Sequence, residues 1–258
     1  MLIGAMNHPQ ADVIEQVEWM AATGLDFVDL TLEPPAAAPQ RIDAAQVRAA
    51  LAAHSMPAVG HTAYYLPIAS PFEPVRAGAV AVLQSCIETF AAIGVAWMNV
   101  HPDVRAPMHD RAFLVQRNLQ SLRELIEAGR QHGVGIMVEN IPGSFNSADQ
   151  LAELLEPLPD LGLHIDIGHC NLRTTENTTY ELVERFGDRL RHVHLHDNKG
   201  GAADLHLPLG TGTVDYCAAV RALKASGYDA TITLEVFSPE SHHLVYSRDA
   251  LRRAWDAA

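Results

Sequence analysis

Residues 190–210 read LRHVHLHDNKGGAADLHLPLG and join a predicted strand to a run of candidate metal ligands. The first six residues alternate as a buried strand does. This places the three nearby histidines on one face, because strand side chains repeat every two residues. A glycine-containing loop then leads to Asp204 and His206. Neutral imidazole and carboxylate are common ligands of zinc, manganese and iron. The segment therefore suggests a metal-binding strand end, although ordinary polar residues at a strand end would give the same pattern.

Short apolar runs alternate with helical patterns along the rest of the chain. The predicted strands are 1–6, 27–32, 58–61, 96–100, 134–138, 161–165, 190–195 and 231–234. The predicted helices are one from Asp12 to before Gly24, then 42–54, 74–93, 110–132, 147–155, 179–186, 214–226 and 247–257. Eight strand–helix units in a chain of this length predict a single α/β domain over 1–258, a (β/α)₈ TIM barrel. The competing doubly wound sheet would normally carry a glycine-rich turn after its first strand, and residues 6–9 read MNHP.

The composition allows a large core and disfavours polyanionic partners. Of the 258 residues, 48% are hydrophobic and 19% charged, and 18 Lys+Arg against 31 Asp+Glu give a net charge of −13. A strongly acidic surface repels nucleic acid and anionic membranes. Bound divalent metal would add positive charge that this count omits, so nucleic acid is disfavoured but left open.

The sequence also predicts a cytoplasmic protein. The first residues lack a basic leader with a long apolar core, so they do not resemble a signal peptide. No run approaches the length of a transmembrane segment. Cys86, Cys170 and Cys217 are odd in number and far apart, which fits a reducing compartment better than a disulfide framework.

Six successive predicted strands finish on side chains that can bind metal. These residues are His61, His101, Glu139, Asp166 with His169, His194 with Asp204 and His206, and Glu235. In a barrel, the carboxyl ends of all strands meet at one mouth, where barrel enzymes carry their chemistry. One histidine at a strand end is usually structural, but six such ends in succession predict a shared metal site.

The residue types suit one to three divalent cations. One set, with three carboxylates and an imidazole that could hold Mn²⁺, Mg²⁺, Co²⁺ or Zn²⁺, is Glu139, Asp166, His194 and Glu235. Carboxylates packed this closely would repel one another without a cation. Two further sets are His61 with His101, and His169 with Asp204 and His206.

In combination, these motifs resemble the xylose-isomerase-like barrel superfamily, which includes endonuclease IV and sugar isomerases and epimerases. The matching segments are VGHTAYYLPIA (59–69), MNVHPD (98–103), MVENIPG (137–143), LHIDIGH (163–169), HVHLHDNK (192–199), DLHLPLG (204–210) and ITLEVF (232–237). In the epimerase-like branch, the resemblance implies that the four-residue set above binds one metal and that its two glutamates flank the substrate. In endonuclease IV, nine positions hold three zinc ions. This chain matches all nine, namely His61, His101, Glu139, Asp166, His169, His194, Asp204, His206 and Glu235.

Three functions follow from this resemblance. The first is isomerisation or epimerisation of a small sugar or hydroxy-carbonyl compound, with Glu139 and Glu235 moving the proton. In that reading His169, His196 and Tyr64 are the expected substrate contacts, although Tyr64 could instead pack under a loop. The second is metal-assisted hydrolysis of a phosphoester. The third is a barrel that binds metal and a ligand without turnover.

Other features bear on these alternatives. Few cations are expected near the mouth, chiefly Arg105, Arg173 and Lys199, and this argues against a DNA substrate. His164 and His192 share a strand face with the ligands and are expected to fill the barrel. A small molecule is therefore the expected partner. Barrels of this kind often pair, so a homodimer stays open.

Overall fold

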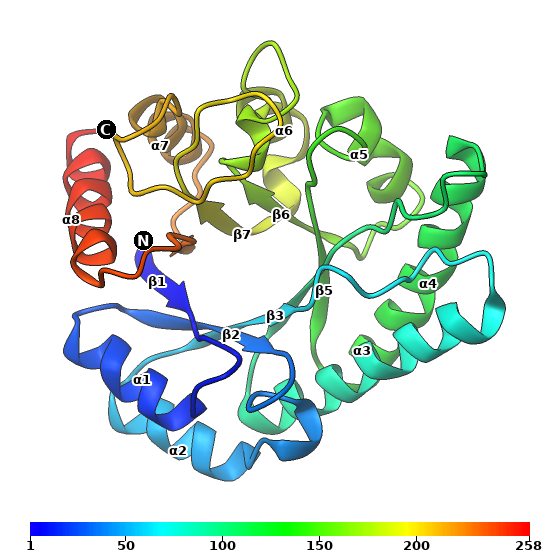
Figure 1. Cartoon of the computed structure of the whole chain (residues 1–258), viewed down its shortest axis with the longest axis horizontal. Coiled ribbons are helices and arrows are strands. Elements are labelled where there is room, and N and C mark those ends of the chain that lie inside the picture. Colours follow the sequence, from blue (N-terminus) through cyan, green and yellow to red (C-terminus); the bar gives the residue numbers. More distant parts are fainter.

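Eight parallel strands close into a barrel in the computed structural model, which describes residues 1–258 (Figure 1). Each strand pairs with the next along the chain, and the eighth pairs with the first. The strands are β1 (Leu2–Met6), β2 (Phe27–Leu32), β3 (Ala58–Thr62), β4 (Trp97–Val100), β5 (Gly135–Glu139), β6 (Gly162–Asp166), β7 (Leu190–Leu195) and β8 (Thr231–Leu234). The fold predicted from the sequence, a single (β/α)₈ barrel, is confirmed.

Eight helices form a ring outside the barrel (Figure 1). They are α1 (Val13–Ala22), α2 (Ala44–Ala53), α3 (Glu73–Ile93), α4 (Arg111–His132), α5 (Ala148–Leu155), α6 (Thr179–Phe186), α7 (Tyr216–Ala225) and α8 (His242–Ala257). Three short 3₁₀ helices are η1 (Pro39–Arg41), η2 (His169–Asn171) and η3 (Gly187–Arg189). The apolar side chains between strands and helices form one continuous core.

Several helix ends follow from local chemistry that the sequence displays. The Asp12 and Asp43 carboxylates accept hydrogen bonds from the first backbone N–H groups of α1 and α2. Ser147 and Gln150 form the predicted capping box of α5. Gly133 takes the left-handed conformation directly after α4, where a side chain would be strained.

The last helix begins earlier than predicted. The sequence pattern suggested Ser247 as its first residue, but α8 starts at His242. Leu244 packs into the core and extends the apolar face of the helix toward its N-terminus. Ser247 is fully buried inside the helix, donates a hydrogen bond to the carbonyl of His243 and accepts one from the Leu209 N–H. Tertiary packing, rather than a serine cap, therefore sets the start of α8.

Helix α3 is the one helix long and apolar enough to cross a membrane by length and composition alone. In the barrel it lies between α2 and α4. Leu83, Ile87 and Phe90 are its largest fully buried side chains and belong to the core. Packing against the barrel thus accounts for its apolar composition.

The inside of the barrel holds a polar layer beneath the mouth. His164 and His192 are buried there, as expected of residues that fill the barrel. They share the space with Asp29 and Thr233, which are also fully buried. The sequence pattern does not single out Asp29, which lies in the middle of β2. The three cysteines are free thiols, and Cys86 and Cys170 are buried.

Candidate metal centre and pocket

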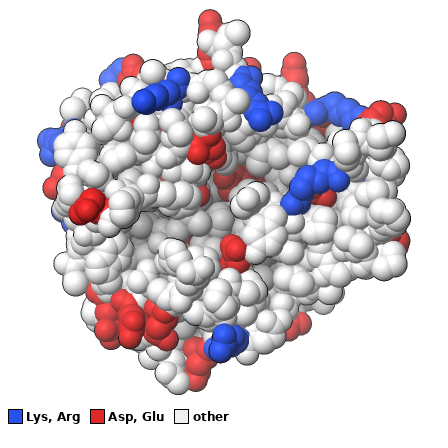
Figure 2. Space-filling model, in the orientation of Figure 1, with Lys and Arg blue, Asp and Glu red and all other residues white.

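A pocket of about 1050 Å³ opens at the carboxyl ends of the strands. Residues from six strand ends contribute to its wall, together with the loops that follow β1, β7 and β8. Figure 2 shows this hollow in the middle of the face, with acidic side chains deep inside it and few basic ones at its edge. The mouth of the barrel is therefore both the place where the predicted ligands meet and the main cavity of the molecule.

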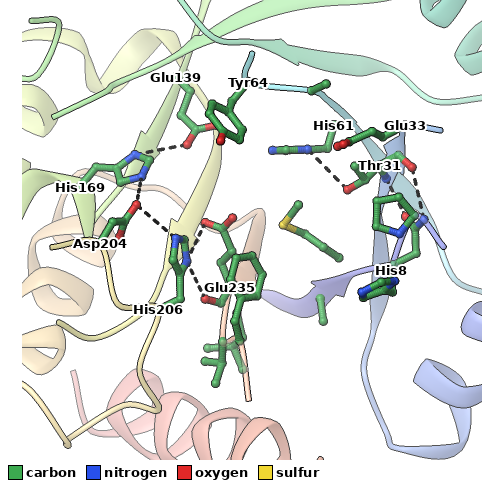
Figure 3. Close-up of a pocket in the computed structure, with 18 of the residues that line it drawn as sticks. His8, Thr31, Glu33, His61, Tyr64, Glu139, His169, Asp204, His206 and Glu235 are labelled. Carbon is green, nitrogen blue, oxygen red and sulfur yellow. Dashed lines mark hydrogen bonds and ion pairs between the residues drawn. The ribbon is translucent and has the colours of Figure 1, made fainter. Parts of the chain in front are cut away.

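All nine predicted metal ligands lie in one connected group, called the rim cluster below. It consists of His61, His101, Glu139, Asp166, His169, His194, Asp204, His206 and Glu235. Short contacts join its members. His101 Nε2 lies 3.0 Å from Glu139 Oε2, and His169 Nε2 and His206 Nε2 each lie 3.1 Å from Asp204 Oδ2. Figure 3 shows part of this network on one wall of the pocket.

The candidate ligand atoms fall into overlapping groups whose members lie within 4.8 Å of one another. Four of these groups belong to the rim: His61–His101–Glu139, Glu139–Asp166–His169, Asp166–His196–Glu235, and His169–His196–Asp204–His206. Three members of the four-residue set predicted from the sequence are therefore spread over two neighbouring groups that share Asp166, and the fourth, His194, belongs to a separate group with His164 and His192. His194 joins those two neighbouring groups because its Nδ1 lies 3.2 Å from Glu235 Oε2 and 4.0 Å from Asp166 Oδ2.

The chemistry of the rim cluster fits divalent cations. Asp166 Oδ2, His101 Nδ1 and His196 Nε2 are buried and have no hydrogen-bond partner in the protein. Buried polar atoms without a partner are rare because burying them carries a free-energy penalty. Imidazole and carboxylate together are the ligand types of zinc and manganese sites. Asp166 and His196 belong to the same candidate ligand group, so coordination to a metal would satisfy Asp166 Oδ2 and His196 Nε2.

Two carboxylates of the cluster are held in the ionised form. Burial opposes ionisation of Glu139, but the His164 and His101 imidazoles outweigh it and hold the pKa of Glu139 well below its usual range. Burial likewise opposes ionisation of Asp166, while His169 and His196 lower its pKa well below the usual value. Both groups are thus ready to bind a cation at neutral pH.

The histidines divide into two electrostatic classes. Burial lowers the pKa of His61 to about 3, so its ring is neutral and can bind metal without losing a proton. Burial also lowers the pKa of His206, but the hydrogen bond with Asp204 and the negative charges of Glu235, Asp204 and Asp166 together outweigh this effect and raise the value to about 9. The pKa of His194 is raised well above its usual value for a similar reason, because Glu235 and Asp29 outweigh its burial. Without metal, these two rings carry protons that a metal would have to displace.

Asp29 supports the cluster from below and was missed by the sequence analysis. Its Oδ2 accepts hydrogen bonds from His194 Nε2 at 2.6 Å and from the Thr233 hydroxyl at 2.8 Å. With Nε2 engaged in this way, His194 turns Nδ1 toward Glu235 and Asp166. A carboxylate behind a metal-binding histidine fixes its tautomer and orientation. The one sequence signal for Asp29 was an acidic residue in an otherwise apolar strand, but the sequence does not show which side chains it contacts.

Asp197 organises the loop that carries Asp204 and His206. Its fully buried carboxylate accepts four backbone hydrogen bonds, from the N–H groups of Asn198, Gly210, Gly212 and Val214. The loop is thereby folded back onto the end of β7. Gly212 is required here because an added Cβ would lie 2.1 Å from the Asn198 carbonyl oxygen. The sequence analysis did not identify this role.

The amide of Asn99 positions Glu139 in a similar way. Its Nδ2 donates to Glu139 Oε2 at 2.7 Å, and its Oδ1 accepts from the Thr62 N–H at 2.8 Å. Asn99 is fully buried in β4, so it links the ends of three neighbouring strands. Asparagine in an apolar strand segment was the only sequence signal for this contact.

The three predicted substrate contacts occupy different positions. Tyr64 and His169 line the pocket, and Tyr64 is 71% exposed. His196 is not among the residues that line it. Its ring is fully buried, stacks on His206 at 4.1 Å between centroids and covers Gly168, where a Cβ would lie 2.2 Å from the ring. His196 therefore packs against the rim cluster, through its contact with His206, on the side away from the pocket.

The pocket is poor in positive charge. Of the three cations expected near the mouth, Arg105 lines the pocket, while Arg173 and Lys199 do not. The Arg105 guanidinium is already engaged, because it donates to Asp103 Oδ1 at 2.7 Å and to the Leu66 carbonyl at 3.0 Å. Five carboxylates line the same pocket: Glu33, Glu139, Asp204, Glu235 and Glu240.

Comparison with known proteins gives a matching family model and two sequence relatives. The family model for xylose isomerase-like TIM barrels matches residues 17–255. An uncharacterized protein of Methanocaldococcus jannaschii is 29% identical over 175 residues, an alignment that covers 65% of this chain and 59% of that protein. A probable endonuclease 4 of Mycobacterium tuberculosis is 28% identical over 239 residues, covering 88% of this chain and 90% of the relative.

Solved structures of epimerases share the fold. A D-tagatose 3-epimerase-like protein superposes with a TM-score of 0.86 and 23% identity, covering 100% of this chain and 98% of that one. A D-psicose 3-epimerase from Clostridium cellulolyticum H10 gives a TM-score of 0.82 and 15% identity, covering 99% of each chain. At these identities, the likeness establishes the fold alone.

Proposed function

Since the chain belongs to the xylose isomerase-like TIM barrel family, we propose that it is a metal-dependent isomerase or epimerase of a small sugar or hydroxy-carbonyl compound. The observation that carries this proposal is the position of Glu139 and Glu235. Both side chains line the same pocket from different strand ends, and Figure 3 shows both carboxylates directed into it. A reaction that removes and returns a proton needs two such groups in one cavity.

We assign the removal of the proton to Glu139, because this carboxylate is held ionised. It would take the proton from the carbon next to the substrate carbonyl, and the electron pair of the broken C–H bond would move onto the carbonyl oxygen. Glu235, in its protonated form, would return a proton to the opposite face or to the neighbouring carbon. Glu139 is held in place by Asn99, so its direction of approach is fixed before substrate arrives.

The metal would be held by residues of the rim cluster. Among these, Asp166 and His194 would bind the metal and take no part in the proton transfer. A bound divalent cation would polarise the carbonyl and hydroxyl oxygens and stabilise negative charge on them.

A second candidate, hydrolysis of a phosphoester, is favoured by one observation. Glu139 belongs to two adjacent groups of ligand atoms, and all nine positions that the resemblance to endonuclease IV implies lie together. A shared carboxylate is what a site with two or more metals needs. The scarcity of free cations in the pocket argues against a polyanionic substrate, and for this reason we place hydrolysis second.

Two assays on protein purified without chelator separate these functions. In D₂O with a panel of free ketoses, we expect solvent deuterium to enter the carbon next to the carbonyl. With a duplex that carries an abasic site, we expect no strand cleavage. Cleavage without deuterium exchange, together with about three zinc ions per chain, would reverse the order of the two candidates. Bound metal with neither activity would indicate a barrel that binds a ligand without turnover.

A further inference from the structure

The pocket has a second half that the rim cluster does not occupy. We call it the arm and define it by six residues from the β1–α1 and β8–α8 sides: Met6, Pro9, Trp19, Val236, Phe237 and Leu244. In Figure 3, His8 and Glu33 lie on the opposite side of the pocket from His169 and Asp204. The pocket therefore extends well beyond the residues that the proposed proton transfer requires.

The six residues that define the arm are apolar and two of them are aromatic, while His8, Gln16, Ser238 and Ser241 line the pocket from the same two sides. Phe237 and Trp19 leave 62% and 37% of their surface exposed, although large aromatic side chains usually gain stability from burial. Phe237 also stacks on His206, with ring centroids 4.3 Å apart, so the arm begins directly beside the rim cluster. Aromatic side chains at the edge of a cavity offer flat apolar surfaces on which the C–H face of a ligand ring can stack.

The charges around the arm exclude an anionic group. Glu33 and Glu240 line the same pocket, and its one arginine, Arg105, is already paired with Asp103. Binding of phosphate normally uses arginine, lysine or free backbone N–H groups. A phosphate placed here would instead meet the like charge of Glu33 and Glu240.

The size of the pocket indicates a ligand larger than one monosaccharide. Its volume of about 1050 Å³ lies at the upper end of the range of about 300–1,000 Å³ that is typical of pockets for drug-sized ligands. A single monosaccharide at the rim cluster would leave the arm unfilled, with its aromatic surface in contact with water.

We propose that the substrate is an uncharged conjugate, in which a hydroxy-carbonyl sugar unit at the rim cluster carries a second neutral ring that occupies the arm. The identity of the first unit rests on the proposed function above. The second ring is recognised by stacking and apolar contact at Phe237, Trp19 and Val236. Sugar phosphates are rejected because the arm supplies repulsion and no cation.

The test compares ketoses that differ in one substituent. Fructose, its 6-O- and 1-O-glucosyl derivatives, and its 6- and 1-phosphates are each titrated into metal-loaded protein by calorimetry. We expect at least one glucosyl ketose to bind about tenfold more tightly than fructose, and both phosphates to bind more weakly. Tightest binding by a phosphate, or no gain from either glucosyl group, overturns the proposal.

Two variants locate the effect. Val236→Trp should fill the arm and Phe237→Ala should remove its stacking face, so each should lower the ratio of glucosyl-ketose affinity to fructose affinity about tenfold. Val82→Trp, on the outer surface of α3, is the matched control and should leave that ratio unchanged. A ratio that is insensitive to both arm variants contradicts the assignment, provided that their thermal unfolding shows folded protein.

Solvent deuterium exchange, measured with the same five compounds, separates failure of the arm from failure of the reaction. If the five compounds bind in the expected order but none exchanges deuterium, the result supports ligand binding in the arm and rejects the isomerase function. Exchange into fructose without the binding order rejects the arm and supports the isomerase.

Discussion

Asp29 Oδ2 and His194 Nε2 are 2.6 Å apart and fully buried inside the barrel. The contact joins the second strand to the seventh across the barrel interior and leaves His194 Nδ1 facing the rim cluster. It places a carboxylate directly behind a proposed metal ligand, and several measurable consequences follow from that placement.

Replacing this carboxylate should weaken metal binding. Asp29→Asn keeps the shape but removes the negative charge that orients His194 and increases its basicity. Loss of such a supporting group typically lowers metal affinity about 10–100-fold. Competition with a fluorescent chelator measures the change, and Asp160→Asn, on the surface, is the control. An affinity equal to that of the unmodified protein would show that Asp29 does not support a metal ligand.

The proton-transfer roles predict a large loss of exchange activity. Glu139→Gln and Glu235→Gln should each lower the rate of solvent deuterium exchange about 10²–10⁴-fold, because an amide neither accepts nor donates the proton. Metal content must be measured in parallel, because both side chains also belong to the cluster. Exposed Glu156 provides the control substitution to Gln. Full exchange by a metal-loaded Glu235→Gln variant would remove Glu235 from the mechanism.

Metal binding should release protons at neutral pH. In the metal-free protein, the pKa of His206 is raised to about 9 and that of His194 lies well above its usual value, so both rings are protonated at pH 7. A histidine must be neutral to bind metal. Apparent affinity should therefore rise from pH 7 to about pH 9. Calorimetry in two buffers with different ionisation enthalpies counts the protons. Binding heats that do not depend on the buffer would contradict this charge state.

The same groups should make the stability of the metal-free protein depend on pH. The folded-state pKa of His206, about 9, exceeds the ordinary value of 6.5. Its pairing with Asp204 therefore stabilises the fold fully below about pH 6.5, and the stabilisation is lost as pH rises through about 9. Urea unfolding at pH 7 and pH 9.5 should show the lower midpoint at pH 9.5. His206→Ala should reduce this difference, and an unchanged difference in that variant would assign it to other groups.

Loss of the Asp197 carboxylate should loosen the loop after β7. Each of its oxygens accepts two backbone hydrogen bonds, and Asp197→Asn would replace one oxygen with a donor group. Two buried N–H groups would then lack partners, at a penalty of about 1–3 kcal/mol each. Limited proteolysis should cut residues 198–213 faster than in Asp188→Asn, a substitution at an exposed site. Equal cleavage rates would show that other contacts hold the loop.

The sequence predicted the fold and the positions that converge because both depend on local order. Strand ends can be located from apolar alternation, and closure of parallel strands brings their carboxyl ends together whatever the sequence separation. His61, Glu139 and Glu235 could therefore be assigned to one mouth without knowledge of any contact between them.

Features that depend on side-chain direction were not predictable in the same way. Asp29 looks like an ordinary polar position of β2, and its partner His194 is 165 residues away. Asp197 binds backbone groups up to 17 residues along the chain, in a loop with no periodic pattern. His196 shares a strand face with the ligands, but its ring is fully buried and stacks on that of His206.

The four backbone hydrogen bonds to Asp197 have a consequence for the binding of the proposed cation. Because these bonds tie both ends of the loop to Asp197, we expect the loop that carries Asp204 and His206 to keep its fold whether or not an ion is bound. An ion can then leave and return without any part of the barrel having to refold. Exchange between different divalent ions should be quick, so the supply in the surroundings would help to select the ion that the protein carries.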